Sequence, residues 1–131
     1  MARGLEQHQA RAEAVSLLGK DLARRARSRC ELCDGHEGAL RPFEVPPVPE
    51  DPSLEHALLL CERCTAGALG EPVEAAQCHF LETAVWSELV PAQVTAVRLL
   101  RRLAGEGAGW AAQTLETVYL PPEVEAWAAQ G

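Results

Sequence analysis

Two Cys-x-x-Cys pairs are the residues in this sequence whose types and spacing indicate chemistry. Cys30 and Cys33 form the first pair, and Cys61 and Cys64 form the second, with 27 residues between the pairs. Each pair can present two sulfur atoms on one side of a tight turn, at the separation that tetrahedral Zn²⁺ requires. Two such turns supply four ligands and leave no open position for water or substrate. The pattern therefore predicts one structural zinc ion.

The alternatives to a zinc site are two redox dithiols or two pairs that occur by chance. A redox dithiol of the Cys-x-x-Cys kind starts a helix within a thioredoxin-like alternation of strands and helices, and no such alternation surrounds either pair. His36 and His56 lie three residues after the first pair and five before the second. Either imidazole could replace a cysteine as ligand, but neither is needed, and we interpret both as histidines of surface loops.

Cys78 and His79 stand next to each other outside both pairs. Neighbouring residues on a helix point about 100° apart, so these two do not converge on one metal ion by themselves. We interpret Cys78 as a buried helical cysteine, the common case for this residue type. The sequence shows no nucleophile–base motif, Gly-rich phosphate loop or HExxH helix, so we assign no catalytic residue and predict that the protein is not an enzyme.

The charge is unevenly distributed along a chain whose net charge is −7. Residues 1–30 carry seven basic and three acidic side chains, a net charge of +4, whereas residues 31–131 carry five basic and sixteen acidic ones, a net charge of −11. An acidic body of this kind repels nucleic acid at long range. Only the basic first segment favours a nucleic-acid partner.

The distribution of apolar residues argues against a membrane protein. No apolar run approaches the roughly 20 residues that cross a bilayer, and residues 1–14 lack the apolar core of an export signal. We therefore expect a cytoplasmic protein without membrane contact. In that reducing compartment, paired cysteines more often bind metal than form disulfides.

The local patterns predict a mainly α fold in three parts that form one compact unit. These parts are an N-terminal basic helix at residues 1–29, a four-cysteine zinc module at 30–70 and a C-terminal helical bundle at 71–131. The middle part contains a small β-hairpin of zinc-ribbon or treble-clef type.

The N-terminal helix is expected at residues 5–28, which are rich in good helix formers and contain no proline. Val15, Leu18 and Leu22 are spaced as one apolar stripe on it. A basic cluster closes the helix, where the helix dipole favours cations. The alternative role of this cluster is contact with an acidic partner or a phosphate, made by Arg24, Arg25, Arg27 and Arg29.

The zinc module is expected to hold two short strands, at residues 40–45 and 57–60. Pro42 would place the first strand at a sheet edge, because proline cannot donate to the ladder. Four prolines within residues 45–52 exclude a helix or a central strand there and indicate a stiff, partly polyproline loop. A segment of this size and composition depends on a metal for its stability.

Helix returns in the C-terminal part, according to its composition and proline positions. We expect one helix from Pro72 to about Trp86, a second that begins at Pro91, a third over residues 110–118 and a last one from Pro121–Pro122. The second helix has an apolar stripe flanked by three arginines that we expect to be solvated, Arg98, Arg101 and Arg102. The stripe consists of Val90, Val94, Val97, Leu100, Leu103 and Ala104.

Several stretches resemble the PhnA-like zinc-ribbon proteins of bacteria, and together they cover about residues 20–129. They are CELC at 30–33, FEVPPVP at 43–49, LLLCERC at 58–64, VWSELVPAQVTAVRLLRRL at 85–103 and VYLPPEVEAWA at 118–128. The family is named for an alkylphosphonate-utilisation operon, a name that does not establish phosphonate chemistry. The sequence ends at Gly131 without the C-terminal β-domain that family members often carry.

A weaker resemblance is to HNH endonucleases, which place a histidine-bearing strand and a Pro-rich loop between their Cys-x-x-Cys pairs. In that pattern the strand histidine activates water and a nearby metal holds the phosphate. The corresponding stretch here is Phe43, Glu44 and Val45, so the general base is absent. Glu44 is the one residue of this strand that could replace it, and a strand glutamate is usually just exposed to solvent.

These patterns lead to one expected function and one alternative. We expect a zinc-stabilised, non-enzymatic module that binds a protein partner or a second copy of itself, with oxidation or zinc sensing as a variant. Its apolar helix faces and three tryptophans, Trp86, Trp110 and Trp127, supply either core or partner surface, and core is expected for most of them. The alternative is a nucleic-acid-binding zinc ribbon on a degenerate HNH-like scaffold.

Overall fold

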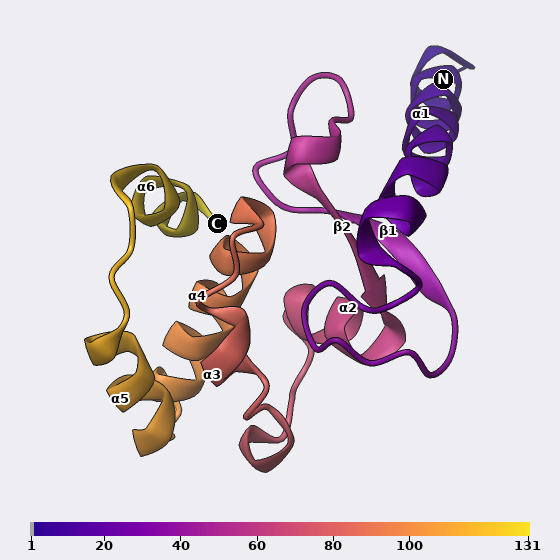
Figure 1. The fold of residues 1–131 in the computed structure, drawn as a ribbon. Coiled ribbons are helices and arrows are strands. Elements are labelled where there is room, and N and C mark those ends of the chain that lie inside the picture. Colours follow the sequence, from indigo (N-terminus) through magenta and orange to yellow (C-terminus); the bar gives the residue numbers. More distant parts are fainter. Residues whose placement is uncertain (1) are drawn as a thin grey trace.

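The computed structural model describes residues 2–131, and for the first two of these only the backbone. The described chain is mainly helical with one small antiparallel hairpin (Figure 1). Its longer elements are α1 (Ala2–Ala26), β1 (Leu40–Glu44), β2 (Ala57–Cys61), α2 (Glu62–Ala68), α3 (Leu81–Ala84), α4 (Val90–Gly105), α5 (Gly109–Thr117) and α6 (Pro122–Gln130). Short 3₁₀ turns lie at Leu54–His56 and Ala75–Gln77.

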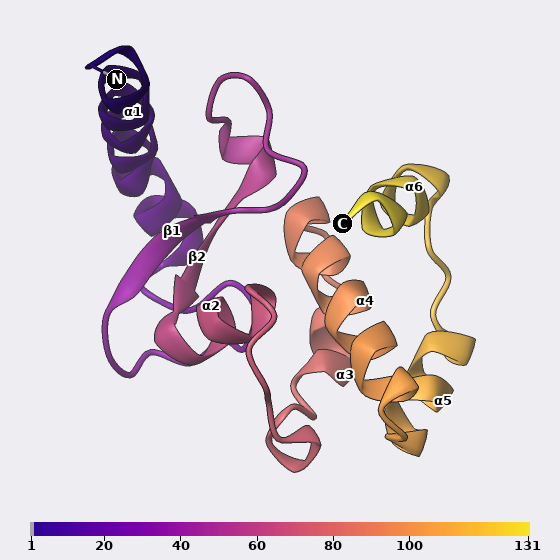
Figure 2. The same ribbon diagram turned by 180° about the vertical axis from the view of Figure 1, so that it is seen from behind.

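Helix α1 confirms the predicted N-terminal helix, although it begins and ends earlier than expected. Arg27 and Ser28 have φ values of 54° and 63°, a left-handed conformation that stops the helix after Ala26. Leu22 is fully buried and packs with Ala57 and Leu59 of β2. The stripe therefore attaches α1 to the hairpin, while the N-terminal turns of α1 extend away from it (Figures 1 and 2).

The hairpin pairs Leu40 with Cys61 at one end and Glu44 with Ala57 at the other. With only two strands, both are edges, so the missing N–H of Pro42 disrupts little. Strand β2 is buried on both faces: Ala57 and Leu59 pack towards α1, whereas Leu58 and Leu60 belong to the main core. Burial on both faces explains its continuous apolar run.

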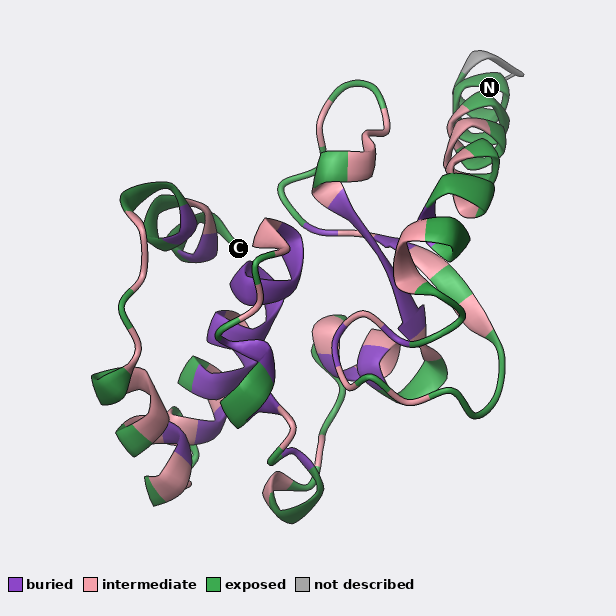
Figure 3. Cartoon of the chain, viewed as in Figure 1, coloured by how far each residue is buried: buried purple, intermediate pink, exposed green. Residues whose placement is uncertain are grey.

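Helix α4 is the centre of the main core. As predicted, a proline starts it, and Val94, Val97, Leu100 and Leu103 of its stripe are buried. The hairpin and α2 lie on one side of α4, and α5 and α6 lie on the other (Figures 1 and 2). Figure 3 shows most of α4 and β2 as buried, so the core extends between them.

The predicted helix from Pro72 to Trp86 is wrong. The chain forms only the 3₁₀ turn Ala75–Gln77 and the four-residue helix α3 in this stretch. The reason is tertiary packing: Val73 contacts the Gly67 region of α2, whereas Leu81 and Val85 are buried in the core beside α4. One straight helix does not serve both contacts, so packing overrides local propensity.

The prediction that the arginines of α4 are solvated is also wrong for two of the three. Arg98 donates hydrogen bonds to the carbonyls of Trp127 and Ala128 in α6, and Arg102 donates to those of Gly67 and Glu71. Each side chain extends from α4, and its guanidinium group reaches backbone carbonyls of a neighbouring segment.

The tryptophans divide between core and surface. Trp110 and Trp127 are partly buried against the main core, whereas Trp86 is 57% exposed. Among residues 2–131, no helix combines the length and the apolar character that crossing a bilayer requires.

Candidate metal centre

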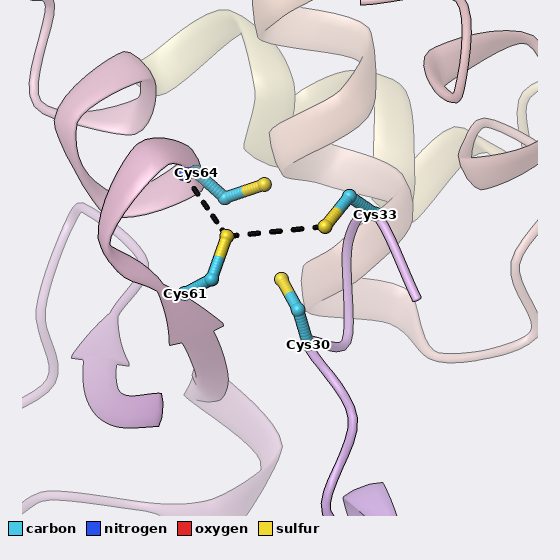
Figure 4. Close-up of side chains that lie close together, drawn as sticks. All are labelled: Cys30, Cys33, Cys61 and Cys64. Carbon is cyan, nitrogen blue, oxygen red and sulfur yellow. Dashed lines mark hydrogen bonds between the residues drawn. The ribbon is translucent and has the colours of Figure 1, made fainter. Parts of the chain in front are cut away.

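The four predicted cysteines meet in one cluster. The Sγ atoms of Cys30, Cys33, Cys61 and Cys64 all lie within 4.8 Å of one another (Figure 4). The Sγ atoms of Cys33 and Cys61 are 3.8 Å apart. In a tetrahedral site with metal–sulfur bonds of about 2.3 Å, sulfur atoms lie about 3.8 Å from one another, so the cluster has the size of a four-thiolate metal site.

The first pair lies on a tight turn after α1. The amide of Cys30 donates to the carbonyl of Gly35 at 2.7 Å, and the amide of Asp34 donates to the carbonyl of Cys30 at 2.9 Å. The amide of Gly35 points at the sulfur of Cys33, 3.4 Å away. A Cβ atom on Gly35 would lie only 3.3 Å from that sulfur, so glycine suits this position. The turn thus directs both sulfurs inward.

The second pair lies where β2 passes into α2. Cys61 is the last residue of the strand and the N-cap of the helix, and its sulfur accepts from the amide of Cys64 at 3.5 Å. Free amide groups at the start of a helix favour negative sulfur. The strand–helix junction therefore directs both sulfur atoms of the second pair towards the first pair.

Burial divides the cluster into an inner and an outer pair. Cys30 and Cys64 are 2% and 3% exposed, while Cys33 and Cys61 are partly exposed and line an open hollow. A hydrogen bond with Cys64 lowers the pKa of Cys30 to about 4 against the opposing effect of burial. The same hydrogen bond, with burial and the neighbouring sulfurs, raises the pKa of Cys64. The two buried sulfur atoms thus interact with each other, and a divalent cation bound between them would favour the thiolate form of both.

A partly buried ion pair that the sequence did not predict lies next to the cysteine cluster. Glu31, inside the first Cys-x-x-Cys, has a side chain only 5% exposed, and both its oxygens accept from Arg25 at 2.8 Å. The amide of Glu31 donates to the carbonyl of Leu59, and the amide of Leu59 donates back to the Glu31 carboxylate, each at 2.8 Å. This network ties α1, the cysteine turn and β2 together. Its sequence signal is slight: one acid within CELC and one arginine at the end of a helix.

The same network separates Arg25 from the other arginines proposed to contact a partner. Besides Glu31, Arg25 donates to the carbonyls of Leu54 and Ala57. Arg24, Arg27 and Arg29 remain exposed. The guanidinium of Arg25 is therefore used within the fold, and only the other three are available to an outside ligand.

Glu44, at the strand position that HNH enzymes use for their base, is also held by an ion pair. Its two oxygens accept from Arg11 of α1 at 2.7 and 3.0 Å, and its side chain is only 16% exposed. Arg11 also donates to the carbonyls of Pro49 and Glu50 in the proline-rich loop. Glu44 thus connects α1 to the hairpin instead of facing solvent.

The histidines and the fifth cysteine do not join the cluster within the described part of the chain. His36 is exposed beside the hollow at Cys33, as predicted, whereas the His56 ring packs on Trp127 with centroids 5.0 Å apart. Cys78 is buried, but it ends a 3₁₀ turn instead of lying in a helix. The Nδ1 atom of His79 lies 2.8 Å from a carboxylate oxygen of Glu82.

Comparisons with known proteins add no relative to this description. No family model, no curated protein and no solved structure matches the chain. The resemblance to PhnA-like proteins and the weaker one to HNH endonucleases stay hypotheses that rest on the motifs alone. What the structure establishes is a mainly helical chain with a small hairpin and four clustered cysteines that are compatible with a metal site.

Proposed function

We propose that the four cysteines bind one structural Zn²⁺ ion. The observation that carries this proposal is the convergence of four sulfur atoms within 4.8 Å, from two chain segments that are far apart in sequence. Zn²⁺ is the usual metal ion in four-thiolate sites. It is a borderline-soft d¹⁰ cation whose d electrons impose no geometric preference, so it accepts the tetrahedral arrangement of four sulfur atoms. Four thiolates fill the coordination sphere, so the ion has no position for a substrate.

The local architecture supports a treble-clef-like module of the PhnA-like kind. One ligand pair comes from a tight turn, and the other comes from the junction of a hairpin strand with a short helix. The sequence predicts the hairpin, but it does not predict the short helix α2 that follows Cys61. The proposed metal would then stabilise residues 30–70, whose strands are short.

We further propose that the protein acts by contact with another protein or a second copy of itself, without catalysis. The ion pairs beside the hairpin support this view. Arg25 is paired with Glu31, and Arg11 is paired with Glu44, so these charged groups are held within the fold and are not free for catalysis. Large apolar side chains remain on the surface and would supply contact area. They include Leu69, Trp86 and Tyr119, which are 68%, 57% and 74% exposed.

The zinc proposal is tested by metal analysis of the purified protein, with two cysteine variants. We expect one zinc per chain in the wild type and a loss of zinc and of folded structure in Cys61→Ser. Cys78→Ser is the matched control, because Cys78 is also buried but lies outside the cluster. It should keep its zinc.

Three results would contradict the proposal. One is wild-type protein, purified under reducing conditions, that contains no metal and gains no stability from added zinc. Another is Cys61→Ser that retains both zinc and fold. A third is zinc loss in Cys78→Ser equal to that in Cys61→Ser, because the metal would then not be held by the four-cysteine cluster.

Nucleic-acid binding is the second candidate, and one observation favours it. Arg24, Arg27 and Arg29 are exposed together where α1 ends and the cysteine turn begins. Their number is small, and two of them already lie near carboxylates: Arg24 is 3.8 Å from Asp21, and Arg29 is 3.6 Å from Asp34.

A further inference from the structure

A hollow between α4, α6 and the hairpin has an unusual charge for this acidic protein. It measures about 360 Å³, within the range of small-molecule sites. β1 and the loop after it, α2, α4 and α6 all contribute to its walls, and none of the lining side chains is acidic. Gly131 also lines the hollow and lies against the guanidinium of Arg98. Apolar and basic side chains line it together, among them Phe43, Val45, Leu99, Arg98, Arg101 and Arg102.

Arg98 is a partly buried arginine at this hollow. Its Nε and Nη2 atoms donate to the carbonyls of Ala128 and Trp127 at 3.2 and 2.6 Å, which uses two of the five N–H groups of a guanidinium. Within residues 2–131 no carboxylate forms an ion pair with it, and burial alone lowers its pKa. The two carbonyls would accept equally from a neutral amide, so they do not explain the need for a charge.

Arg102 and Arg101 also have donors left over. Arg102 donates through its two Nη atoms to carbonyls at the end of α2, but its Nε is buried without a hydrogen-bond partner, and the nearest carboxylate, that of Glu106, is 3.9 Å away. Arg101 contacts both oxygens of Glu125 through one nitrogen, Nη2. Within the described residues its Nε and Nη1 atoms have no hydrogen-bond partner.

Two other hollows in the described part of the chain are lined by acidic side chains as well. The one beside Cys33 and Cys61 includes Glu37 and Glu62, and the one beside α2 and β1 includes Glu62 and Glu71. In a chain of net charge −7, three arginines line this partly apolar hollow, and of these Arg101 is paired with Glu125 while Arg98 has no carboxylate partner among residues 2–131. An anion placed there would offset the cost of burying Arg98 without an acidic partner.

We propose that this hollow binds a small molecule that carries one carboxylate or phosphate group on an apolar body. The anionic group lies against the free donors of Arg98, Arg101 and Arg102, and the apolar body lies against Phe43, Val45 and Leu99. The site is independent of the metal centre, because none of the four cysteines lines it. Since α4 contacts both β2 and α6 here (Figure 1), and Trp127 of α6 donates to the carbonyl of Pro46 after β1, a bound ligand would also strengthen the contact of the hairpin with α4 and α6.

The experiment is calorimetric titration of the purified full chain with four probes: phenyl phosphate, benzoate, benzamide and inorganic phosphate. Benzamide is the neutral analogue of benzoate and separates charge recognition from apolar contact. We expect saturable one-site binding of phenyl phosphate or benzoate, with benzamide at least about tenfold weaker than benzoate. Inorganic phosphate should bind more weakly than phenyl phosphate, because it has no apolar body.

Variants place the site. Arg98→Gln should weaken the binding of the better aromatic anion at least about tenfold, because one charge-assisted contact is lost. Arg24→Gln, an exposed arginine on α1, should leave it unchanged. If Arg98→Gln does not fold, Arg101→Gln removes a more exposed guanidinium and should weaken binding in the same direction, and Ala68→Leu should block the hollow from the α2 side.

Four results would overturn the proposal. They are the absence of binding by either aromatic anion at millimolar concentration, equal binding of benzoate and benzamide, equal binding of phenyl phosphate and inorganic phosphate, and unchanged affinity in Arg101→Gln and Ala68→Leu. The second shows an apolar site without charge recognition, and the third shows a simple oxyanion site. The fourth places the ligand elsewhere on the molecule.

Discussion

At the scale of single residues, the four cysteines lie beside a partly buried ion pair, Arg25–Glu31, that joins α1 to the cysteine turn. The type and spacing of the cysteines are sufficient to predict the cluster, because two Cys-x-x-Cys turns that meet supply the four sulfur ligands of a tetrahedral ion. The partners of Glu31 were not predictable, because Arg25 looks like any other cation at the end of a helix. Only the three-dimensional path of α1 across the hairpin shows that this arginine faces inward.

Glu31→Gln should therefore destabilise the protein without removing its metal. The change leaves the charge of Arg25 without its partner in a poorly solvated place, and we expect the free energy of unfolding to fall by about 2–4 kcal/mol. Urea titration of the zinc-loaded protein measures this fall, with metal analysis alongside. Asp34→Asn is the control, because its pair with Arg29 is exposed and should contribute less than about 1 kcal/mol. Equal effects of the two changes would show that the Glu31 network does not stabilise the fold.

The uneven burial of the cysteines predicts which of them oxidises first. In zinc-loaded protein, hydrogen peroxide should reach Cys33 and Cys61 before the buried Cys30 and Cys64. The two outer thiolates, one peroxide molecule and two protons give one disulfide and two water molecules, with release of the metal. Peptide mapping at low conversion should find Cys33 joined to Cys61, whose sulfurs are 3.8 Å apart. First appearance of a disulfide within either Cys-x-x-Cys pair would contradict this order.

At the scale of elements, the sequence predicts those whose local pattern and packing agree. Prolines and apolar periodicity identify α4 and α6 correctly, and the strands differ from expectation by one residue at one end each. The composition of the stretch from Pro72 to Trp86 predicts one helix. Its side chains pack on two different elements instead, so only a 3₁₀ turn and the short helix α3 form there. The long-range contacts of Arg98 and Arg102 were likewise invisible, since they join residues about 30 positions apart.

Leu22→Ala should loosen α1 from the hairpin. Leu22 is fully buried between α1 and β2, and truncation of such a leucine costs about 2–4 kcal/mol of the free energy of unfolding. Leu17 is the matched control on the same helix, because it is 78% exposed, and Leu17→Ala should change stability by less than about 0.5 kcal/mol. Urea titration gives both values, and hydrogen exchange should show faster exchange in α1 of the Leu22 variant. Equal exchange in both variants would mean that this contact does not hold the helix.

At the scale of the whole molecule, charge sets what the protein can approach. The basic N-terminal segment lies against a body of net charge −11, and two of its arginines, Arg11 and Arg25, are paired within the fold. Long-range repulsion from that body opposes the few exposed cations. Large apolar side chains are exposed as well, among them Trp86 and Tyr119.

The protein should therefore fail to bind nucleic acid even at low salt. Fluorescence anisotropy with labelled double-stranded and single-stranded DNA and with RNA at about 20 mM salt provides the test, since phosphate contacts are strongest there. Binding that weakens steeply with added salt, and that is lost when Arg24, Arg27 and Arg29 are all changed to Gln, would favour the nucleic-acid candidate over the protein-interaction role.

The two-sided burial of β2 has a consequence for how the chain finds its structure. Ala57, Leu58, Leu59 and Leu60 are all apolar, so a strand shifted by one residue would still present apolar side chains to both sides. Hydrophobicity alone discriminates weakly between the correct pairing and its neighbours. A one-residue shift would, however, turn Cys61 to the wrong face and remove one of four ligands from the cluster. A bound ion would thus stabilise only the native register of the two strands.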